Sequence, residues 1–216
     1  MDGKVGQGAI ILHDYWRSSS AYRLRIALNL LGQPYQRHPV DLVAGEQAAA
    51  AHLARNPQGL VPVLDIDGQR LTQSLAILEY LDEVHAAGFL PADALGRARV
   101  RALSHAVAME IQPVCNLRVA KYAISQSAGA ITMESWMQHF IALGLSGLEG
   151  MLTPGAGFCH GDAVTMADIC LIPQIYNARR WGLDLGQWPV TGAIAGKLEA
   201  IPAFAAAHPD LVKPST

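Results

Sequence analysis

Cysteine is scarce in this chain of 216 residues: Cys115, Cys159 and Cys170 are its three cysteines, and none forms a Cys-x-x-Cys pair. An odd count without paired spacing argues against a disulfide framework and predicts a reducing compartment. Long apolar runs are missing as well, which argues against a transmembrane helix. The polar, glycine-rich residues 1–8 lack the basic start and apolar stretch of a secretion signal. We therefore expect a cytoplasmic protein with no membrane partner.

An excess of charge of one sign is also missing, since the formal net charge is −2 at pH 7 and the isoelectric point is about 6.4. Without a basic face, nucleic acid is not an expected partner. None of the eight histidines forms a His-Glu-x-x-His motif or a close pair with cysteine, so we expect no metal site. Lysine is rare too, at four residues, and the other twelve basic residues are arginines. An arginine presents a planar fork that can bind a carboxylate through two hydrogen bonds.

The first half of the chain alternates strand-like and helix-like segments. Strands are expected at 9–16, 35–40, 61–66 and 69–72, and helices after 17–20, at 47–55 and from Ser74. Pro39 lacks a ladder donor and places the second strand at a sheet edge. Asp67-Gly68 predicts a type I′ hairpin between the last two strands. Because crossovers through helices make the first two strands parallel, the order predicts a mixed four-stranded sheet of the thioredoxin type over 9–86.

The second half has no segment with the period of a strand. Helical patterns cover 96–122 (with a kink near Pro113), 130–152, a segment that starts at Thr165 and contains Pro173, and 190–200. Asp168 is interpreted as a structural helix cap. With a linker over 86–93, the sequence predicts an all-helical domain over 93–212.

Three turns of the first domain carry polar groups suited to ligand binding. Arg17-Ser18-Ser19-Ser20 lies at a strand-to-helix turn, where free backbone amides and hydroxyls can stabilise a thiolate. Val61-Pro62 opens a strand, and a cis proline there would expose the backbone of Val61 to a peptide. Gln73-Ser74 begins a helix, with Ser74 as its expected cap, and the first amides of this helix can hold a carboxylate. Each turn alone is also explained by an ordinary cap or a trans proline, but together they describe a site for a short peptide with a thiol and a carboxylate.

The residues in and around these turns resemble a known family. The segments YWRSSSAYRLRIAL (15–28), NPQGLVPVL (56–64) and QSLAILEYL (73–81) are similar to glutathione transferases, and within them to the zeta class of maleylacetoacetate and maleylpyruvate isomerases. In the second half, Ile111-Gln112-Pro113 with Asn116, and GDAVTMADI (161–169), agree with this class. The resemblance covers about 200 residues.

The resemblance implies a role for each of several residues. Ser18 would donate to the sulfur of glutathione, with Ser19 and Ser20 beside it. The other glutathione contacts would come from Gln47, Val61, Pro62, Gln73 and Ser74 in the first domain, and from Gln112 and Asn116, which would close over it from the helical domain. The substrate, a small dicarboxylate, would meet Arg17, Arg118 and Arg180. The resemblance also implies a homodimer.

One position departs from the class, whose signature at this turn usually reads Ser-Ser-Cys-Ser. Here Ser20 stands where the cysteine is expected. Thiol activation needs only hydroxyl and amide donors, whereas any role of the cysteine sulfur is lost. Three functions therefore stay open: a glutathione-dependent cis–trans isomerase of maleyl compounds in aromatic catabolism, a general transferase that conjugates or dehalogenates small electrophiles, and a non-catalytic binding module. Ser18 and the three arginines favour the isomerase.

Overall fold

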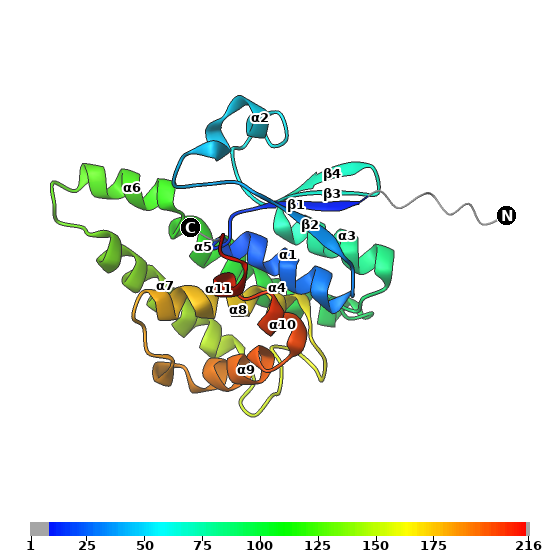
Figure 1. The fold of residues 1–216 in the computed structure, drawn as a ribbon. Helices are drawn as coiled ribbons and strands as arrows, with labels where there is room; N and C mark the ends of the chain where they lie inside the picture. The colour runs from blue at the N-terminus through cyan, green and yellow to red at the C-terminus, as the bar shows by residue number, and fades with distance from the viewer. Residues whose placement is uncertain (1–8, 215–216) are drawn as a thin grey trace. The chain divides into compact units, whose positions relative to one another are not determined.

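The computed structural model describes residues 9–214. They fall into two compact units, of which the first combines the residues up to Ala87 with those from Ala203 onward, and the second spans Gly88–Pro202. The first unit contains a β-sheet, whereas the described elements of the second are helices (Figure 1). Both fold classes agree with the prediction.

The first unit is built on a four-stranded mixed sheet with the order β2-β1-β3-β4. The strands are β1 (Ile10–Asp14), β2 (Tyr35–Pro39), β3 (Val63–Ile66) and β4 (Gln69–Thr72). β1 runs parallel to β2, and β3 runs antiparallel to both β1 and β4. The edge position expected for β2 is confirmed. Asp67 and Gly68 have φ values of 52° and 72°, as the predicted type I′ turn requires.

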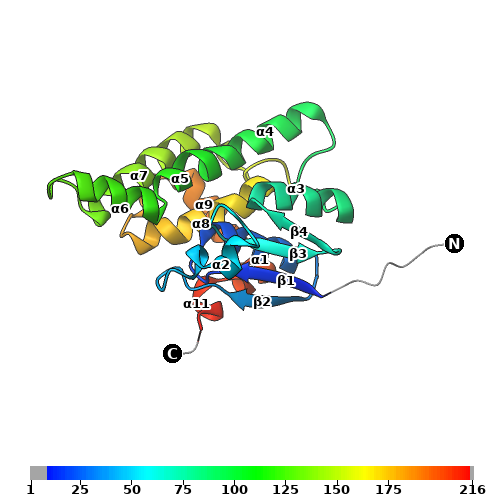
Figure 2. The same cartoon turned by 90° about the horizontal axis from the view of Figure 1, so that it is seen from above.

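Two helices, α1 (Ser19–Leu30) and α3 (Ser74–His85), lie on one face of this sheet, and the short α2 (Ala50–Leu53) lies on the other side (Figures 1 and 2). α1 is buried continuously over residues 21–28, so it forms the centre of this unit. The single helix predicted over 47–55 is wrong. Ala49 is extended (φ −69°, ψ 147°) and separates a 3-10 helix, η1 (Glu46–Ala48), from α2.

The last helices, α10 (Pro202–Ala206) and α11 (Pro209–Val212), run beside α1 (Figure 1). The sequence places residues 203–212 in the helical domain, whereas in the structure they belong with the first unit. The reason is a set of bonds from side chains to the C-terminal backbone: Asn29 Nδ2 donates to the Ala203 carbonyl at 3.0 Å, and Arg25 and Arg37 bind two further carbonyls. Such single contacts leave no periodic pattern in the sequence.

The second unit consists of helices packed around α8 (Met166–Arg180). The other elements are α4 (Ala94–His105), a π-helix η2 (Ala106–Ile111), α5 (Gln112–Val114), α6 (Leu117–Gln126), α7 (Met133–Met151), a 3-10 helix η3 (Leu185–Gln187) and α9 (Pro189–Glu199). α8 packs against α4, α7, α9 and η2, and residues 166–175 are buried on every side. A helix that is surrounded in this way is the core of its unit. Among residues 9–214, no helix is long and apolar enough to cross a membrane.

The second unit confirms one cap and corrects one helix. Asp168 caps α8 as predicted: one carboxylate oxygen accepts from the Thr165 amide and hydroxyl, each at 2.8 Å, and the other accepts from the Cys159 amide at 2.8 Å. The continuous kinked helix predicted over 96–122 is instead broken at Asn116. This residue is extended and accepts from the Arg118 amide at 3.0 Å, so it starts α6 as a new helix.

Candidate active site

The three polar turns of the first unit lie at the same end of the sheet because of the strand register. His13, at the end of β1, pairs with Val63, the first residue of β3. Val63 in turn pairs with Thr72, the last residue of β4. The turn that follows β1, the segment that precedes β3 and the turn that follows β4 are therefore neighbours. The sequence patterns predicted the turns, and the register brings them together.

Ser18 is the N-cap of α1. Its Oγ accepts a hydrogen bond from the Ala21 amide at 3.2 Å. A hydroxyl carries one proton and two acceptor positions, so this cap uses an acceptor position and leaves the proton available for donation. Ser19 and Ser20 follow as the first residues of the helix, and both are half-buried. The amides and the positive end of the helix dipole favour an anion at this point.

Arg17 is held by the two aromatic residues before it. Its Nη2 donates to the Tyr15 hydroxyl at 2.9 Å, and its Cζ lies 4.6 Å from the centroid of the Trp16 ring. Within residues 9–214, its guanidinium has no carboxylate partner. An ordinary surface ion pair therefore does not explain Arg17. The arrangement fixes a cation beside Ser18 and leaves its carboxylate-binding capacity unused.

The second turn contains the predicted cis proline: the Val61–Pro62 peptide bond is cis. The carbonyl of Leu60, just before it, accepts from His52 Nε2 at 3.0 Å and from Asn56 Nδ2 at 2.9 Å. Both donors are buried, at 2% exposure each, so they define the path of the backbone that leads into Val61. Gly59 has a φ of 63°, and a β-carbon there would lie 3.3 Å from the Gln47 carbonyl.

The third turn differs from the prediction in its cap. The N-cap of α3 is Gln73, and Ser74 is the first residue of the helix. Gln73 has the left-handed φ of 67° with ψ of 104°, a conformation that costs a non-glycine residue about 1–3 kcal/mol and that concentrates at ligand sites. Its Nε2 donates to Gln58 Oε1 at 2.7 Å, which ties this turn to the proline loop. The buried Arg23 donates to the hydroxyl of Ser74 at 2.6 Å.

Gln47 lies in η1, with its backbone carbonyl next to Gly59. Its Oε1 is buried and accepts no hydrogen bond within residues 9–214. A buried acceptor without a donor is costly. Gln47 is thus suited to receive an N–H group from a peptide ligand.

The predicted residues of the second unit lie on two of its segments. Gln112 begins α5 and Asn116 caps α6, next to the exposed Arg118. The side chain of Arg118 forms no ion pair within the described part of the chain. Arg180, at the end of α8, is also exposed and lies with its Cζ 4.9 Å from the Trp181 ring centroid. Its neighbour Arg179 pairs with Glu199.

The cysteines lie outside this chemistry. All three are buried, and none is in a disulfide bond. Burial raises the pKa of Cys115 to about 11 and raises that of Cys159 well above its ordinary value, so neither is a thiolate at neutral pH. Among residues 9–214, no group of three His, Cys, Asp or Glu side chains is placed to hold a metal ion.

Known proteins are similar to this chain in both sequence and fold. Residues 8–83 match the family model of the glutathione S-transferase N-terminal domain. Over 208 residues the chain is 58% identical to the maleylacetoacetate isomerase of Rhizobium meliloti (strain 1021). The match covers 94% of this chain and 98% of that protein. A solved structure of maleylpyruvate isomerase, described as a bacterial glutathione S-transferase in the zeta class, is 39% identical with a TM-score of 0.90 and covers 95% of this chain and 100% of the other. The chain belongs to the zeta-class glutathione transferase family.

A second solved relative carries a ligand. It is the maleylacetoacetate isomerase from Anaeromyxobacter dehalogenans 2CP-1, solved with glutathione bound in its active site. It is 46% identical to this chain, with a TM-score of 0.84, and the match covers 94% of this chain and 96% of that one. The family resemblance inferred from the sequence motifs is thereby confirmed.

Several residues that position the turns of this candidate site were missed from the sequence. One is Tyr15, whose hydroxyl accepts a hydrogen bond from Arg17. Two more, His52 and Asn56, donate to the Leu60 carbonyl. The last two are Arg23 and Arg25 of α1. Arg23 and Arg25 are charged residues in a helix that is otherwise buried and apolar. Since arginines rarely become fully buried without a partner, two arginines within an otherwise apolar helix were the available signal.

Proposed function

We propose that this chain is a glutathione-dependent cis–trans isomerase that converts maleyl compounds, such as maleylacetoacetate or maleylpyruvate, into their fumaryl isomers in aromatic catabolism. The observation that carries the proposal is the adjacency of Ser18 and Arg17. The first is a helix cap with its hydroxyl proton available, and the second is a fixed guanidinium that has no carboxylate partner among residues 9–214. One group suits a thiolate, and the other suits a substrate carboxylate.

The residues of the first unit fit glutathione. The N-terminus of α3 with Ser74 suits a carboxylate. The Val61 backbone and the side-chain Oε1 of Gln47 suit peptide groups, and Ser18 suits the sulfur. Bound glutathione supplies a thiolate that adds to the substrate double bond, permits rotation about the resulting single bond, and leaves unchanged. The relatives named as maleylacetoacetate and maleylpyruvate isomerases support this choice of substrate.

The protein side chains then have two tasks. Ser18 donates its proton to the sulfur, which favours the thiolate over the thiol and lowers the thiol pKa. Arg17, Arg118 and Arg180 bind the carboxylates of the dianion and stabilise the negative charge that develops on the carbonyl next to the double bond. Preorganised cations suit this second task because they need no rearrangement during the reaction.

The test follows the conversion of maleylpyruvate and maleylacetoacetate by the purified protein. With glutathione at a lower concentration than the substrate, we expect turnover without net consumption of thiol. With S-methylglutathione, whose sulfur is blocked, we expect no turnover. Loss of thiol together with substrate would identify a conjugating transferase instead. Glutathione binding without turnover of either substrate would identify a binding module.

We further propose that the protein works as a homodimer in the cytoplasm. Exposed apolar side chains in the second unit support self-association: Met109, Leu117 and Tyr122 are 57%, 43% and 70% exposed. The three cysteines, none of which is in a disulfide bond, support a reducing compartment. Light scattering coupled to size-exclusion chromatography measures the mass, and a monomer at micromolar concentration would contradict the first of these proposals.

A further inference from the structure

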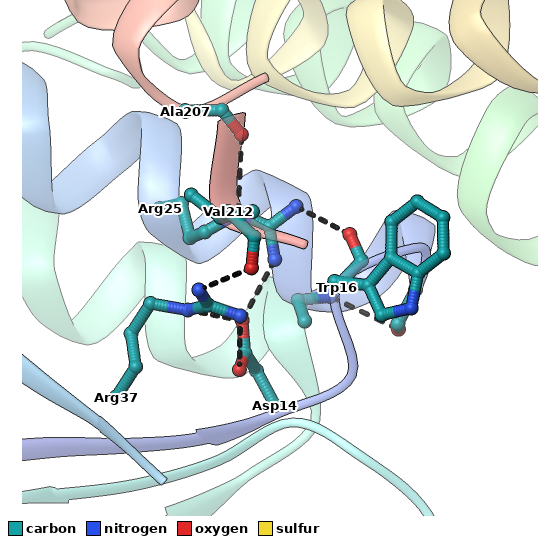
Figure 3. Close-up of polar contacts among 8 residues, drawn as sticks. Asp14, Trp16, Arg25, Arg37, Ala207 and Val212 are labelled. Carbon is teal, nitrogen blue, oxygen red and sulfur yellow. Dashed lines mark hydrogen bonds and ion pairs between the residues drawn. The ribbon is translucent and has the colours of Figure 1, made fainter. Parts of the chain in front are cut away.

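Arg25 connects the C-terminal segment, residues 203–214, to the turn that carries Ser18. Its side chain is wholly buried, and its guanidinium reaches three acceptors (Figure 3). Nε donates to the Ala207 carbonyl at 3.1 Å, Nη1 to Asp14 Oδ2 at 2.8 Å, and Nη2 to the Trp16 carbonyl at 2.9 Å. The C-terminal segment and the residue before Arg17 thus share one rigid, planar donor group.

A second arginine repeats the connection through the same carboxylate. Arg37, on β2, donates to both oxygens of Asp14, at 3.1 and 3.0 Å, and its Nη1 donates to the Val212 carbonyl at 2.7 Å (Figure 3). Asp14 is fully buried and lies between these two guanidinium groups. Each guanidinium also donates to one carbonyl of the C-terminal segment, that of Ala207 or of Val212. A buried ion pair of this kind is weak evidence for stability, and its best-attested use is to fix one geometry.

The ring of Trp16 is held from the same segment. The Lys213 ammonium lies 5.4 Å from the ring centroid, and the Arg17 guanidinium lies 4.6 Å from it. Trp16 is therefore tied to the C-terminal segment twice: its carbonyl through Arg25, and its ring through Lys213. The next residues in the chain are Arg17 and Ser18.

We propose that the C-terminal segment, residues 203–214, is a positioning element for the thiol-activating turn, and that Arg25 transmits its position to Arg17 and Ser18 through Trp16. The inference rests on the proposed function, because it assigns Ser18 and Arg17 their roles there. Arg25 touches neither glutathione nor the substrate in this scheme. It sets the direction of the Trp16 carbonyl, and with it the direction in which the chain enters the cap of α1.

The principal test is the variant Arg25→Lys, which keeps a cation beside Asp14 but loses the planar fork. The pKa of the bound glutathione thiol is titrated by thiolate absorbance, and kcat/KM is measured from pH 6 to 9. We expect the thiol pKa to rise by about one unit, with kcat/KM about tenfold lower at low pH and largely recovered at high pH. The control is Arg70→Lys, which changes another arginine that pairs with a carboxylate of the same sheet, Asp65, and should leave the profile unchanged.

A second variant covers the case in which Arg25→Lys does not fold. A chain that ends at Leu211 lacks the Val212 carbonyl and Lys213 but retains the contact of Arg25 with Ala207. We expect it to show the same direction of change in the thiol pKa, with a smaller shift. Lys213→Met in the full chain isolates the contact with the Trp16 ring.

The inference is overturned if the folded variants have lower thermal stability but the wild-type thiol pKa and pH profile, because the segment would then be structural alone. Glutathione binding is measured calorimetrically on the same samples, without substrate. A wild-type protein that does not bind glutathione would contradict the proposed function itself. Normal binding and turnover in the wild type, with unshifted variants, would contradict only the role of the C-terminal segment.

Discussion

Arg23 donates a 2.6 Å hydrogen bond from Nη1 to the hydroxyl of Ser74, and the two side chains are only 2% and 6% exposed. The bond joins α1 to the first turn of α3. Because the hydroxyl oxygen accepts from Arg23, its own proton is available to a carboxylate at the helix N-terminus. The buried guanidinium adds positive charge at the same point, where the dipole of α3 already favours an anion.

Replacement of Ser74 by alanine should weaken glutathione binding and leave the pKa of the bound thiol unchanged. The loss of one charge-assisted hydrogen bond should cost about 1.5–3 kcal/mol, or roughly 10- to 150-fold in Kd. Calorimetric titration with glutathione measures this effect. An analogue that lacks the γ-glutamyl α-carboxylate supplies the control, since it should bind wild type and variant equally. If the variant lost the same factor for both ligands, the hydroxyl would not contact that carboxylate.

Ser18→Gly separates the two roles of Ser18. Glycine is tolerated at an N-cap at a cost of only a few tenths of a kcal/mol, so the helix should remain while the hydroxyl is lost. We expect the pKa of the bound thiol to rise by about one unit or more, since a donor to the thiolate contributes about 1–3 kcal/mol. Thiolate absorbance titration reports the value, and Ser19→Gly is the matched variant. An unchanged pKa in Ser18→Gly would reduce Ser18 to a cap.

Much of the first unit could be predicted from local signals. The Asp67-Gly68 turn, the edge proline Pro39 and the alternation of strand and helix predicted the sheet, and their outcomes are as expected. The helix boundaries were less predictable. The breaks at Ala49 and Asn116 depend on single extended residues within helix-forming sequence, where the cost of breaking a helix is small compared with the packing on either side.

The candidate site shows the same division. Ser18, Val61-Pro62 and Gln73-Ser74 lie in turns that the sequence marks, and the register of β1, β3 and β4 makes them neighbours. Arg25 and Arg37 could not be assigned in this way. Their acceptors are backbone carbonyls of the C-terminal segment, at sequence separations of 182 and 175 residues. Any residue type can supply a carbonyl, so no motif identifies such a partner.

Glu149 should make part of the stability of the protein pH-dependent. This residue of α7 caps α9: its carboxylate accepts from the Val190 and Thr191 amides, each at 2.9 Å, and from the Thr191 hydroxyl at 2.6 Å. Burial alone would raise the pKa of Glu149, but these hydrogen bonds outweigh it and hold the pKa below the ordinary value of 4.5. The folded state therefore favours the carboxylate. Its stabilisation is complete above the unfolded pKa and is lost as the pH falls through the folded one.

Glu149→Gln should thus lower the free energy of unfolding by about 1–3 kcal/mol at pH 7, with a smaller difference from wild type at pH 3.5. Urea denaturation at the two pH values measures both effects. Glu134→Gln is the control on the same helix, because the carboxylate of Glu134 accepts an exposed hydrogen bond from Gln138 and caps no other helix among residues 9–214. A constant deficit for Glu149→Gln at both pH values would show that its charge is not the cause.

Cys115 should be chemically silent in the folded protein. Its thiol is buried, and burial raises its pKa to about 11, so the thiolate that alkylating reagents attack is nearly absent at pH 8. We expect iodoacetamide to label this cysteine only after denaturation, as read by mass spectrometry. Cys115→Ala should keep kcat/KM and cost about 1 kcal/mol of stability for the buried sulfur that is removed. A large loss of turnover would instead place this thiol in the reaction.

The three arginines provide the sharpest test of the isomerase itself. Arg17, Arg118 and Arg180 should each be needed for turnover but not for glutathione binding, because their proposed ligand is the substrate dianion. Removing one such contact should cost about 2–4 kcal/mol in the transition state, or roughly 30- to 1000-fold in kcat/KM. Lysine should be nearly as damaging as alanine, since it keeps the charge but loses the bidentate fork.

Arg179 is the matched control for these variants, because it adjoins Arg180 on α8 and has no role in the proposed mechanism; it pairs with Glu199. Arg179→Lys should change stability by at most about 0.5 kcal/mol and leave the kinetics unchanged. Glutathione affinity and maleylpyruvate turnover are measured for each variant. Near wild-type turnover in all three arginine variants would remove the chemical basis of the isomerase assignment. A silent Arg118→Ala alone would leave the mechanism intact and would favour the longer maleylacetoacetate, whose distant carboxylate would then be bound by another group.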